Sequence, residues 1–154
     1  MGSEILKKFE KSGFKTIGID INIKNIKKNF SKKISTLTDN YKYIQFADII
    51  VVALPTPLTK NLNPDLKILK NSIKTMGRFL KKGQLISLES STYPGTTEEI
   101  IGSLLNKKKF KLSKDFFLVY SPERISPEMT IKKVKGIKYK LHNTPKICAG
   151  FSKE

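Results

Sequence analysis

The chain has 154 residues, which is enough for one domain with a hydrophobic core but too few for two domains of ordinary size. Its formal net charge of +17 comes almost entirely from lysine, because Arg78 and Arg124 are the only arginines. The lysines are spread along the whole chain, which favours a solvated surface over a nucleic-acid footprint. Binding of a polyanion through these lysines stays open as an alternative.

The composition also bears on location and metal binding. No apolar run approaches the roughly 20 residues of a membrane-spanning helix, so no membrane contact is expected. The single cysteine, Cys148, can build neither a disulfide framework nor a cysteine-based zinc site, and we expect it in the core. These features favour a cytoplasmic protein without a bound metal.

Apolar segments recur at intervals of about thirty residues, and five of them are predicted to be strands. The segment 47–54 is continuously apolar rather than alternating, which is typical of a parallel strand covered on both faces. The predicted strands are 15–20, 47–54, 84–89, 115–120 and 146–150.

Helical patterns with recognisable ends lie between most of these strands. Asn63 is suited to cap a helix with Pro64 at its first position, and Thr96 with Glu99 has the spacing of a capping box. The expected helices are 3–12, one beginning at Asn22, one from Asn63 to Gly83 and one from Thr96 to Leu105. The alternation of strand and helix predicts a doubly wound, Rossmann-like α/β fold with a parallel sheet.

Ligands of open α/β sheets bind outside the carboxyl ends of the strands, so the residues there are candidates for binding. Asp20 ends the first predicted strand, where an acidic side chain accepts hydrogen bonds from the adenine ribose and favours NAD over NADP. A turn or helix-capping carboxylate is its alternative role. Pro55 and Pro57 fix the backbone around Thr56 after the second strand, either as a rigid strand exit or as a wall beside a cofactor.

The third and fourth strands also end in polar residues. Ser90, Ser91 and Thr92 follow the third strand, and turn chemistry does not explain these three hydroxyls as a group. Glu123 and Arg124 follow the fourth strand, where a carboxylate could act as a base or hold a water beside a cation suited to a sugar or phosphate. A surface ion pair is the alternative for these two residues.

One feature of a dinucleotide-binding domain is missing from this sequence. The acidic residue normally lies about 20 residues beyond a glycine-rich loop, which places that loop at or before Met1. The chain contains no G-x-G-x-x-G. We therefore expect residues 1–154 to form a single partial domain that lacks the first strand, the phosphate loop and a substrate domain. Weak or undetectable NAD binding, open backbone edges and a lower solubility should follow.

Five stretches in register resemble the NAD-binding half of the nucleotide-sugar 6-dehydrogenases. Their order and spacing cover nearly the whole chain, and the Pro-Asp-Leu and Tyr-Pro-Gly-Thr-Thr details are more similar to the branch that acts on UDP-N-acetylhexosamines than to the UDP-glucose branch. The stretches are GFKTIGIDIN (13–22), ADIIVVALPTPLTKNLNPDL (47–66), LKKGQLISLESSTYPGTTEE (80–99), DFFLVYSPERISP (115–127) and TPKICAG (144–150).

This resemblance implies an activity and a set of cofactor contacts. Family members oxidise the C6 alcohol of a UDP-sugar to a carboxylate by two hydride transfers to NAD. The resemblance implies that Asp20 holds the adenine ribose and that Pro55 and Thr56 flank the cofactor. It implies a cofactor contact and a catalytic role for Ser91, which stands where the family's Glu-Ser-Thr motif has threonine.

On the substrate side, the resemblance implies that Glu123 is the catalytic carboxylate that orders the hydrolytic water, and that Arg124 and Ile125 contact the UDP-sugar. The family's catalytic lysine, asparagine and nucleophilic cysteine have no counterpart here, so we expect no activity from the chain alone. A homodimer or pairing with a C-terminal half is the expected assembly. A UDP-glucose 6-dehydrogenase fragment and a non-catalytic basic binding module are the alternatives.

Overall fold

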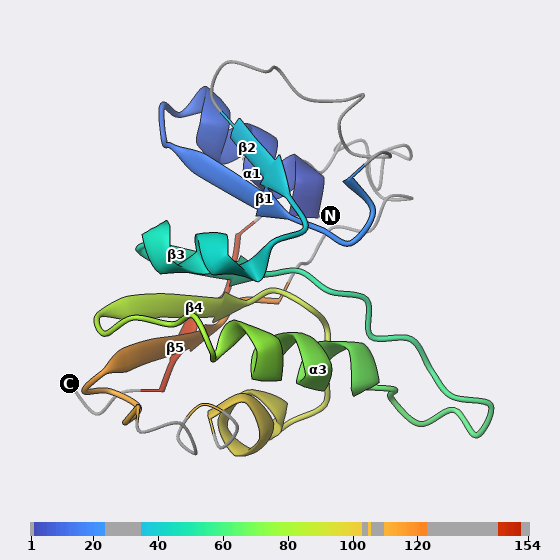
Figure 1. Cartoon of the computed structure of the whole chain (residues 1–154). Coiled ribbons are helices and arrows are strands. Elements are labelled where there is room, and N and C mark those ends of the chain that lie inside the picture. Colours follow the sequence, from blue (N-terminus) through green and yellow to red (C-terminus); the bar gives the residue numbers. More distant parts are fainter. Residues whose placement is uncertain (1, 24–34, 103–104, 106–109, 123–144, 152–154) are drawn as a thin grey trace.

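The computed structural model describes residues 2–23, 35–102, 105, 110–122 and 145–151 (Figure 1). These residues form a layered α/β structure with two sheets. In the first sheet two strands pair in parallel, and in the second four strands follow one another in chain order, the last of them antiparallel. The first sheet consists of β1 (Thr16–Ile19) and β2 (Ser35–Thr38), and the second of β3 (Ile49–Val52), β4 (Gln84–Leu88), β5 (Phe116–Tyr120) and β6 (Ala149–Gly150).

The predicted α/β fold with parallel strands is confirmed, and two strand predictions need correction. The predicted strand 146–150 is reduced to the two residues of β6, which run antiparallel to β5 at the edge of the sheet. The sequence argument also missed β2, because its sequence Ser-Thr-Leu-Thr contains a single aliphatic residue and gives no apolar run.

Within the described residues, four helical segments accompany the strands. The first, α1, covers the first sheet, while α3 lies beside η2 against the second sheet (Figure 1). The predicted helix from Asn22 falls largely in 24–34, outside the described residues. The segments are the α-helices α1 (Gly2–Lys11) and α3 (Lys67–Met76), the 3-10 helix η1 (Tyr41–Phe46) and the π-helix η2 (Thr96–Gly102).

The start of α3 differs from the prediction. Leu58 and Pro64 form an antiparallel bridge, and the N–H of Thr59 donates to the carbonyl of Asn63 at 2.7 Å. These contacts make a hairpin of the segment that was predicted to begin the helix, so α3 starts at Lys67. The bridge within this hairpin takes the place of the helix cap that was predicted at Asn63.

The capping box predicted from Thr96 and Glu99 is not formed. The hydroxyl of Thr96 donates to the carbonyl of Tyr93 at 2.8 Å, and the N–H of Glu99 donates to the carbonyl of Gly95 at 2.8 Å. The Thr96 hydroxyl therefore serves the preceding Tyr-Pro-Gly turn rather than the backbone of Glu99.

The hydrophobic core belongs to the second sheet. Every buried apolar residue in the described part of the chain lies between Ile44 and Leu118. Leu69, Ile73 and Met76 carry one face of α3 into this core, as the helical spacing requires. By contrast, α1 and β1 contain no fully buried residue. No helix in these described ranges is long and apolar enough to cross a membrane.

Candidate functional site

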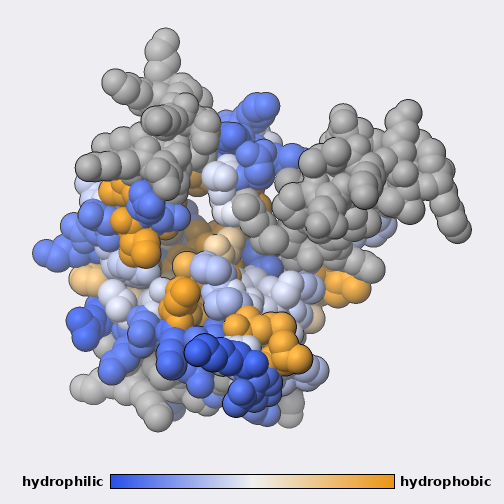
Figure 2. All heavy atoms as spheres, turned by 90° about the vertical axis from the view of Figure 1, so that its right-hand side faces the viewer, coloured by the Kyte–Doolittle hydropathy of each residue, from blue (hydrophilic) through white to orange (hydrophobic). Residues whose placement is uncertain are grey.

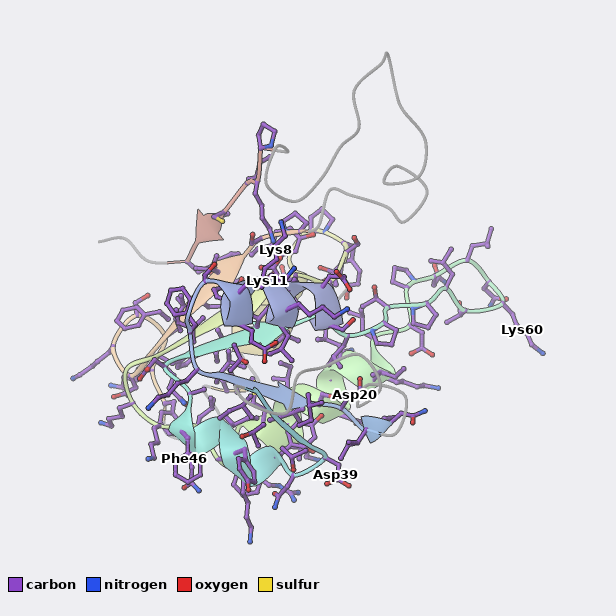
Figure 3. All side chains as sticks on the ribbon, turned by 90° about the horizontal axis from the view of Figure 1, so that it is seen from above. Lys8, Lys11, Asp20, Asp39, Phe46 and Lys60 are labelled. Carbon is purple, nitrogen blue, oxygen red and sulfur yellow. The ribbon has the colours of Figure 1, made fainter. Side chains whose placement is uncertain are left out.

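The candidate site lies at the carboxyl ends of the strands. The arrows of the parallel strands in both sheets point to the same side of the molecule (Figure 1), so the residues that follow β1, β3 and β4 share one rim. Asp20 lies beyond the tip of β1, on the side that also carries the loop of Lys60 (Figure 3). The fold thus brings the segments after Asp20, Ala53 and Glu89 to one edge, as expected for an open parallel sheet.

Asp20 is exposed and is held by the turn that follows β1. Its N–H donates to the carbonyl of Thr38 at 3.1 Å, which extends the pairing of β1 with β2. Its Oδ1 accepts the N–H of Asn22 at 2.7 Å. The turn role predicted as an alternative is therefore present, while no described residue donates to Oδ2.

Ser90 joins the ends of β3 and β4. Its Oγ accepts the N–H of Leu54 at 2.9 Å and donates to the carbonyl of the same residue at 2.7 Å. Ser90 is 4% exposed. Because Leu54 and Ser90 lie two positions beyond the paired Val52 and Leu88, the side chain of Ser90 extends the contact between β3 and β4 past their last residue pair. This explains one of the three clustered hydroxyls as a structural group.

Thr56 and Ser91 form a second link across the same two strand ends. The hydroxyl of Thr56 donates to the carbonyl of Ser91 at 2.7 Å. Ser91 itself is exposed, and its hydroxyl has no hydrogen-bond partner among the described residues. The two links therefore differ in consequence: Ser90 uses its hydroxyl to hold the backbone, while Ser91 offers its hydroxyl at the surface.

These strand ends border a depression of about 370 Å³. From the side that faces the strand tips, hydrophobic residues are visible in a hollow between hydrophilic ones (Figure 2). The sequence argument placed Pro55, Thr56 and Ser91 here but missed the contribution of the first residue of α1. The lining residues are Gly2, Ala53, Leu54, Pro55, Thr56, Ser90 and Ser91.

A buried carboxylate lies next to this rim. Glu89 accepts a hydrogen bond from the hydroxyl of Ser87 at 3.0 Å on Oε1 and forms an ion pair with Lys146 through Oε2. The pair ties the segment before β6 to the end of β4. Its signal in the sequence is weak, a glutamate at the end of an apolar predicted strand, and the partner 57 positions away could not be identified without the fold.

Cys148 is exposed, which contradicts its predicted place in the core. The reason is that β6 is a two-residue edge strand whose residues are both exposed. Its Sγ lies 3.3 Å from the hydroxyl of Ser121. Within the part of the chain that the structure describes, no three His, Cys, Asp or Glu side chains are grouped as a metal site would require.

The substrate-side candidates Glu123, Arg124 and Ile125 lie outside the described residues. The strand that leads to them, β5, ends at Tyr120 and is followed by buried Ser121. The described part of the site is therefore the cofactor side predicted from the sequence, with Asp20, Thr56 and Ser91.

A parallel sheet with a free carboxylate oxygen after one strand, a hydroxyl-lined depression after its neighbours and a helix beginning at that depression defines a Rossmann-type dinucleotide-binding domain. The residues present fit the ribose and the outer wall of such a ligand. The fit does not include a G-x-G-x-x-G loop, which the sequence lacks.

Sequence comparison identifies the family. The profile of the UDP-glucose/GDP-mannose dehydrogenase family, NAD binding domain, matches residues 24–139, and the chain belongs to this family. It is 38% identical over 104 residues to the UDP-N-acetyl-D-glucosamine 6-dehydrogenase of Pseudomonas aeruginosa, a match that covers 67% of this chain and 25% of that protein. It is 38% identical over 128 residues to the protein CapL of Staphylococcus aureus, covering 73% and 30% of the two chains.

Structural comparison agrees with this assignment. The solved UDP-N-acetylmannosamine dehydrogenase of Pyrococcus horikoshii matches with a TM-score of 0.70 and 27% identity over 80% of this chain and 34% of that one. The NDP-N-acetyl-D-galactosaminuronic acid dehydrogenase of Methanosarcina mazei Go1 matches with a TM-score of 0.65 and 28% identity, covering 78% and 24%. The chain therefore spans about a quarter to a third of the length of these relatives.

Proposed function

We propose that this chain provides the NAD-contacting part of a UDP-N-acetylhexosamine 6-dehydrogenase and is inactive alone. The observation that carries the proposal is the Thr56–Ser91 link at a depression on the carboxyl edge of the sheet, in a chain that belongs to this dehydrogenase family. The names of the relatives from P. aeruginosa and P. horikoshii support the N-acetylhexosamine branch over the UDP-glucose branch.

On the cofactor side, each residue has a separate task. Bound NAD would supply the hydride acceptor. The free Oδ2 of Asp20 would accept hydrogen bonds from the ribose hydroxyls, and its charge would repel a 2′-phosphate. Pro55 would form an apolar wall beside the cofactor, while the Ser91 hydroxyl would hold a substrate oxygen or a water near the reacting carbon. The Thr56–Ser91 bond would keep this hydroxyl at the rim.

On the substrate side, the proposal assigns Glu123 to ordering the hydrolytic water and Arg124 and Ile125 to contacting the UDP-sugar. Residues 1–154 would act as a single partial domain in the cytoplasm. A C-terminal half, or a dimer that supplies one, would contribute the remaining catalytic groups.

A titration with NAD followed by backbone NMR tests the cofactor assignment. We expect shifts that centre on Asp20, Thr56 and Ser91 with a dissociation constant of about a millimolar, because a phosphate loop is missing from the sequence. The variant Asp20→Asn should lose the preference for NAD over NADP. An unchanged spectrum at about ten times that concentration, or shifts centred elsewhere, would refute the assignment.

The substrate assignment needs an activity measurement. The chain, combined with a separately produced C-terminal half of a relative, should form NADH with a UDP-N-acetylhexosamine. NADH formation with UDP-glucose alone would favour the other branch, and no reaction with either sugar would favour a non-catalytic role.

A basic binding module is the second candidate, and one feature of α3 favours it. Lys67, Lys70 and Lys74 recur at helical spacing on α3, Arg78 follows in the turn after the helix, and all four are exposed. The helix itself contains no acidic residue. A polyanion would therefore meet three lysines along about 10 Å of helix, with Arg78 in the turn beyond its end.

A charge-reversal comparison tests this candidate. The double variant Lys70→Glu with Lys74→Glu reverses two of the exposed charges on α3. The control variant Lys8→Glu with Lys11→Glu changes the net charge of the protein by the same amount but on α1. Binding of labelled oligonucleotide that falls with salt, and falls much further in the α3 variant than in the α1 variant, would support the module. An equal loss in both variants would indicate nonspecific attraction by net charge.

A further inference from the structure

The parallel strands of the second sheet all begin at the edge opposite to the candidate site. The segments that precede β3, β4 and β5 are therefore neighbours in space, although they are far apart in the sequence. Phe46, at the end of η1, lies on this side of the molecule, away from Asp20 and Lys60 (Figure 3). This surface, the amino edge, consists of Tyr43 and Phe46 before β3, Lys81 and Lys82 before β4, and Lys111 and Lys114 before β5.

A buried side chain fixes the first two of these segments to one another. Gln84, at the start of β4, is 3% exposed. Its Nε2 donates to the carbonyls of Ile44 and Ala47 at 2.8 and 2.5 Å, and its Oε1 accepts the N–H of Lys81 at 2.7 Å. The helix η1 is thereby held against the turn before β4, so its aromatic side chains keep a fixed place beside Lys81.

Asp115 connects the second segment to the third. Its Oδ1 is paired with Lys82 at 2.9 Å, and its Oδ2 accepts the N–H of Lys111 at 2.9 Å. The hydrogen bond with Lys82, the N–H of Lys111 and the charge of Lys114 lower the pKa of Asp115, so this carboxylate stays ionised at neutral pH. Asp115 offsets one of the lysine charges. The side chains of Lys111 and Lys114 are exposed at the surface.

An aromatic pair lies within reach of these charges. The rings of Tyr43 and Phe46 are 6.1 Å apart between centroids, and the Phe46 side chain is 65% exposed. The Nζ of Lys81 lies 5.8 Å from the centroid of the Phe46 ring. An exposed ring beside an ammonium group offers a surface for stacking and a positive charge to the same ligand.

We propose that the amino edge binds a single strand of nucleic acid, with a base stacked on Phe46 and backbone phosphates held by Lys81, Lys111 and Lys114. A duplex fits less well, because its bases already stack on one another and present no free face to the ring. Lysine meets phosphate as a point charge, so binding should depend little on base sequence. The exposed Asp48 at this edge is outnumbered by the lysines.

This site goes beyond both functions proposed above. It lies at the edge of the sheet opposite to the NAD-contacting rim, and it uses none of the lysines of α3. The dispersed lysines of the sequence give no sign of it, because only the pairing of β3, β4 and β5 brings them together.

Fluorescence anisotropy with a labelled single strand of about 12 deoxyadenosines tests the stacking on the intact chain. Phe46→Ala should weaken binding about fivefold to a hundredfold, while Phe46→Tyr should retain it. The control Phe14→Ala removes another ring, 58% exposed, and should change the affinity by less than about twofold. A strand of the same length without bases should bind weakly, and Phe46→Ala should not weaken it further.

The salt dependence tests the phosphate contacts. For a single strand, each lost contact lowers the slope of log affinity against log salt concentration by about 0.7, so Lys81→Gln with Lys114→Gln should lower it by about 1.4. Two control variants lose the same charge elsewhere and should keep the slope of the unchanged chain. They are Lys70→Gln with Lys74→Gln on α3 and Lys8→Gln with Lys11→Gln on α1.

Four results would overturn the proposal. These are equal losses for Phe46→Ala and Phe14→Ala, equal affinity for the strands with and without bases, a lower slope in the α3 or α1 variant instead, and tighter binding of a duplex of the same length. Vesicles that contain phosphatidylserine provide a further comparison. Binding to them without binding to the single strand would assign the amino edge to a membrane surface and would also refute the proposal. All of these measurements are made without NAD, so their outcome does not depend on the cofactor site.

Discussion

The double bond between Ser90 and Leu54 gives the sharpest prediction of stability. Replacing Ser90 with alanine removes a bond of 2.9 Å from the Leu54 N–H and one of 2.7 Å to the Leu54 carbonyl. Both Leu54 groups lie at a strand end where the described chain offers no other partner. A lost hydrogen bond costs about 0.5–1.5 kcal/mol, and an unsatisfied buried group about 1–3 kcal/mol.

Water has partial access to Leu54, so the cost of leaving its two backbone groups without Ser90 is reduced. We therefore expect Ser90→Ala to lower the free energy of unfolding by about 2 kcal/mol. Urea denaturation of Ser90→Ala should show it as a lower midpoint with an unchanged m-value. The matched control is Ser91→Ala, which removes an exposed hydroxyl one position away and should change the free energy by less than about 0.5 kcal/mol. Equal effects of the two substitutions would refute the assigned role of Ser90.

Three further changes test the core, an ion pair and a turn. Leu69→Ala removes a side chain that is 0% exposed and should cost about 2–5 kcal/mol in calorimetry, against less than about 1 kcal/mol for half-exposed Ile68→Ala. Gly95→Ala should destabilise by about 1 kcal/mol in urea, because Gly95 has a φ of 89°. The hydrogen bond with Lys82 lowers the pKa of Asp115 below 3.8, so its stabilisation is complete above that pH and is lost as pH falls through the lowered value. Acid unfolding of Asp115→Asn should therefore show a flatter pH dependence in this range; an unchanged slope would contradict the pairing.

The site described here also separates two kinds of polar group in one short stretch. Ser90 and Glu89 are buried and engaged by Leu54 and Lys146 respectively, while Ser91 remains exposed. This rim therefore holds its backbone through buried side chains and leaves the Ser91 hydroxyl exposed.

The helices show most clearly how far local sequence patterns can predict this structure. The run of apolar residues at helical spacing correctly located the buried face of α3. Its first residue was wrong, because the Asn63–Pro64 cap signal competes with a hairpin between Leu58 and Pro64. At Thr96 the hydroxyl donates to the carbonyl of Tyr93, three residues back, and this bond replaces the capping box. Local signals for a cap depend on a single hydrogen bond, which another nearby contact of similar strength can displace.

The sequence by itself determined the α/β class, four of the strands and the positions of Asp20, Thr56 and Ser91 at strand ends, because apolar runs and turn residues act over a few neighbours. Only the tertiary structure decided which hydroxyl is structural, that Cys148 is exposed and that Glu89 meets Lys146. Leu54 and Ser90 are 36 positions apart, and their hydrogen bonds exist only because β3 and β4 pair in one register. Such pairings depend on the whole chain and leave no mark in either local segment.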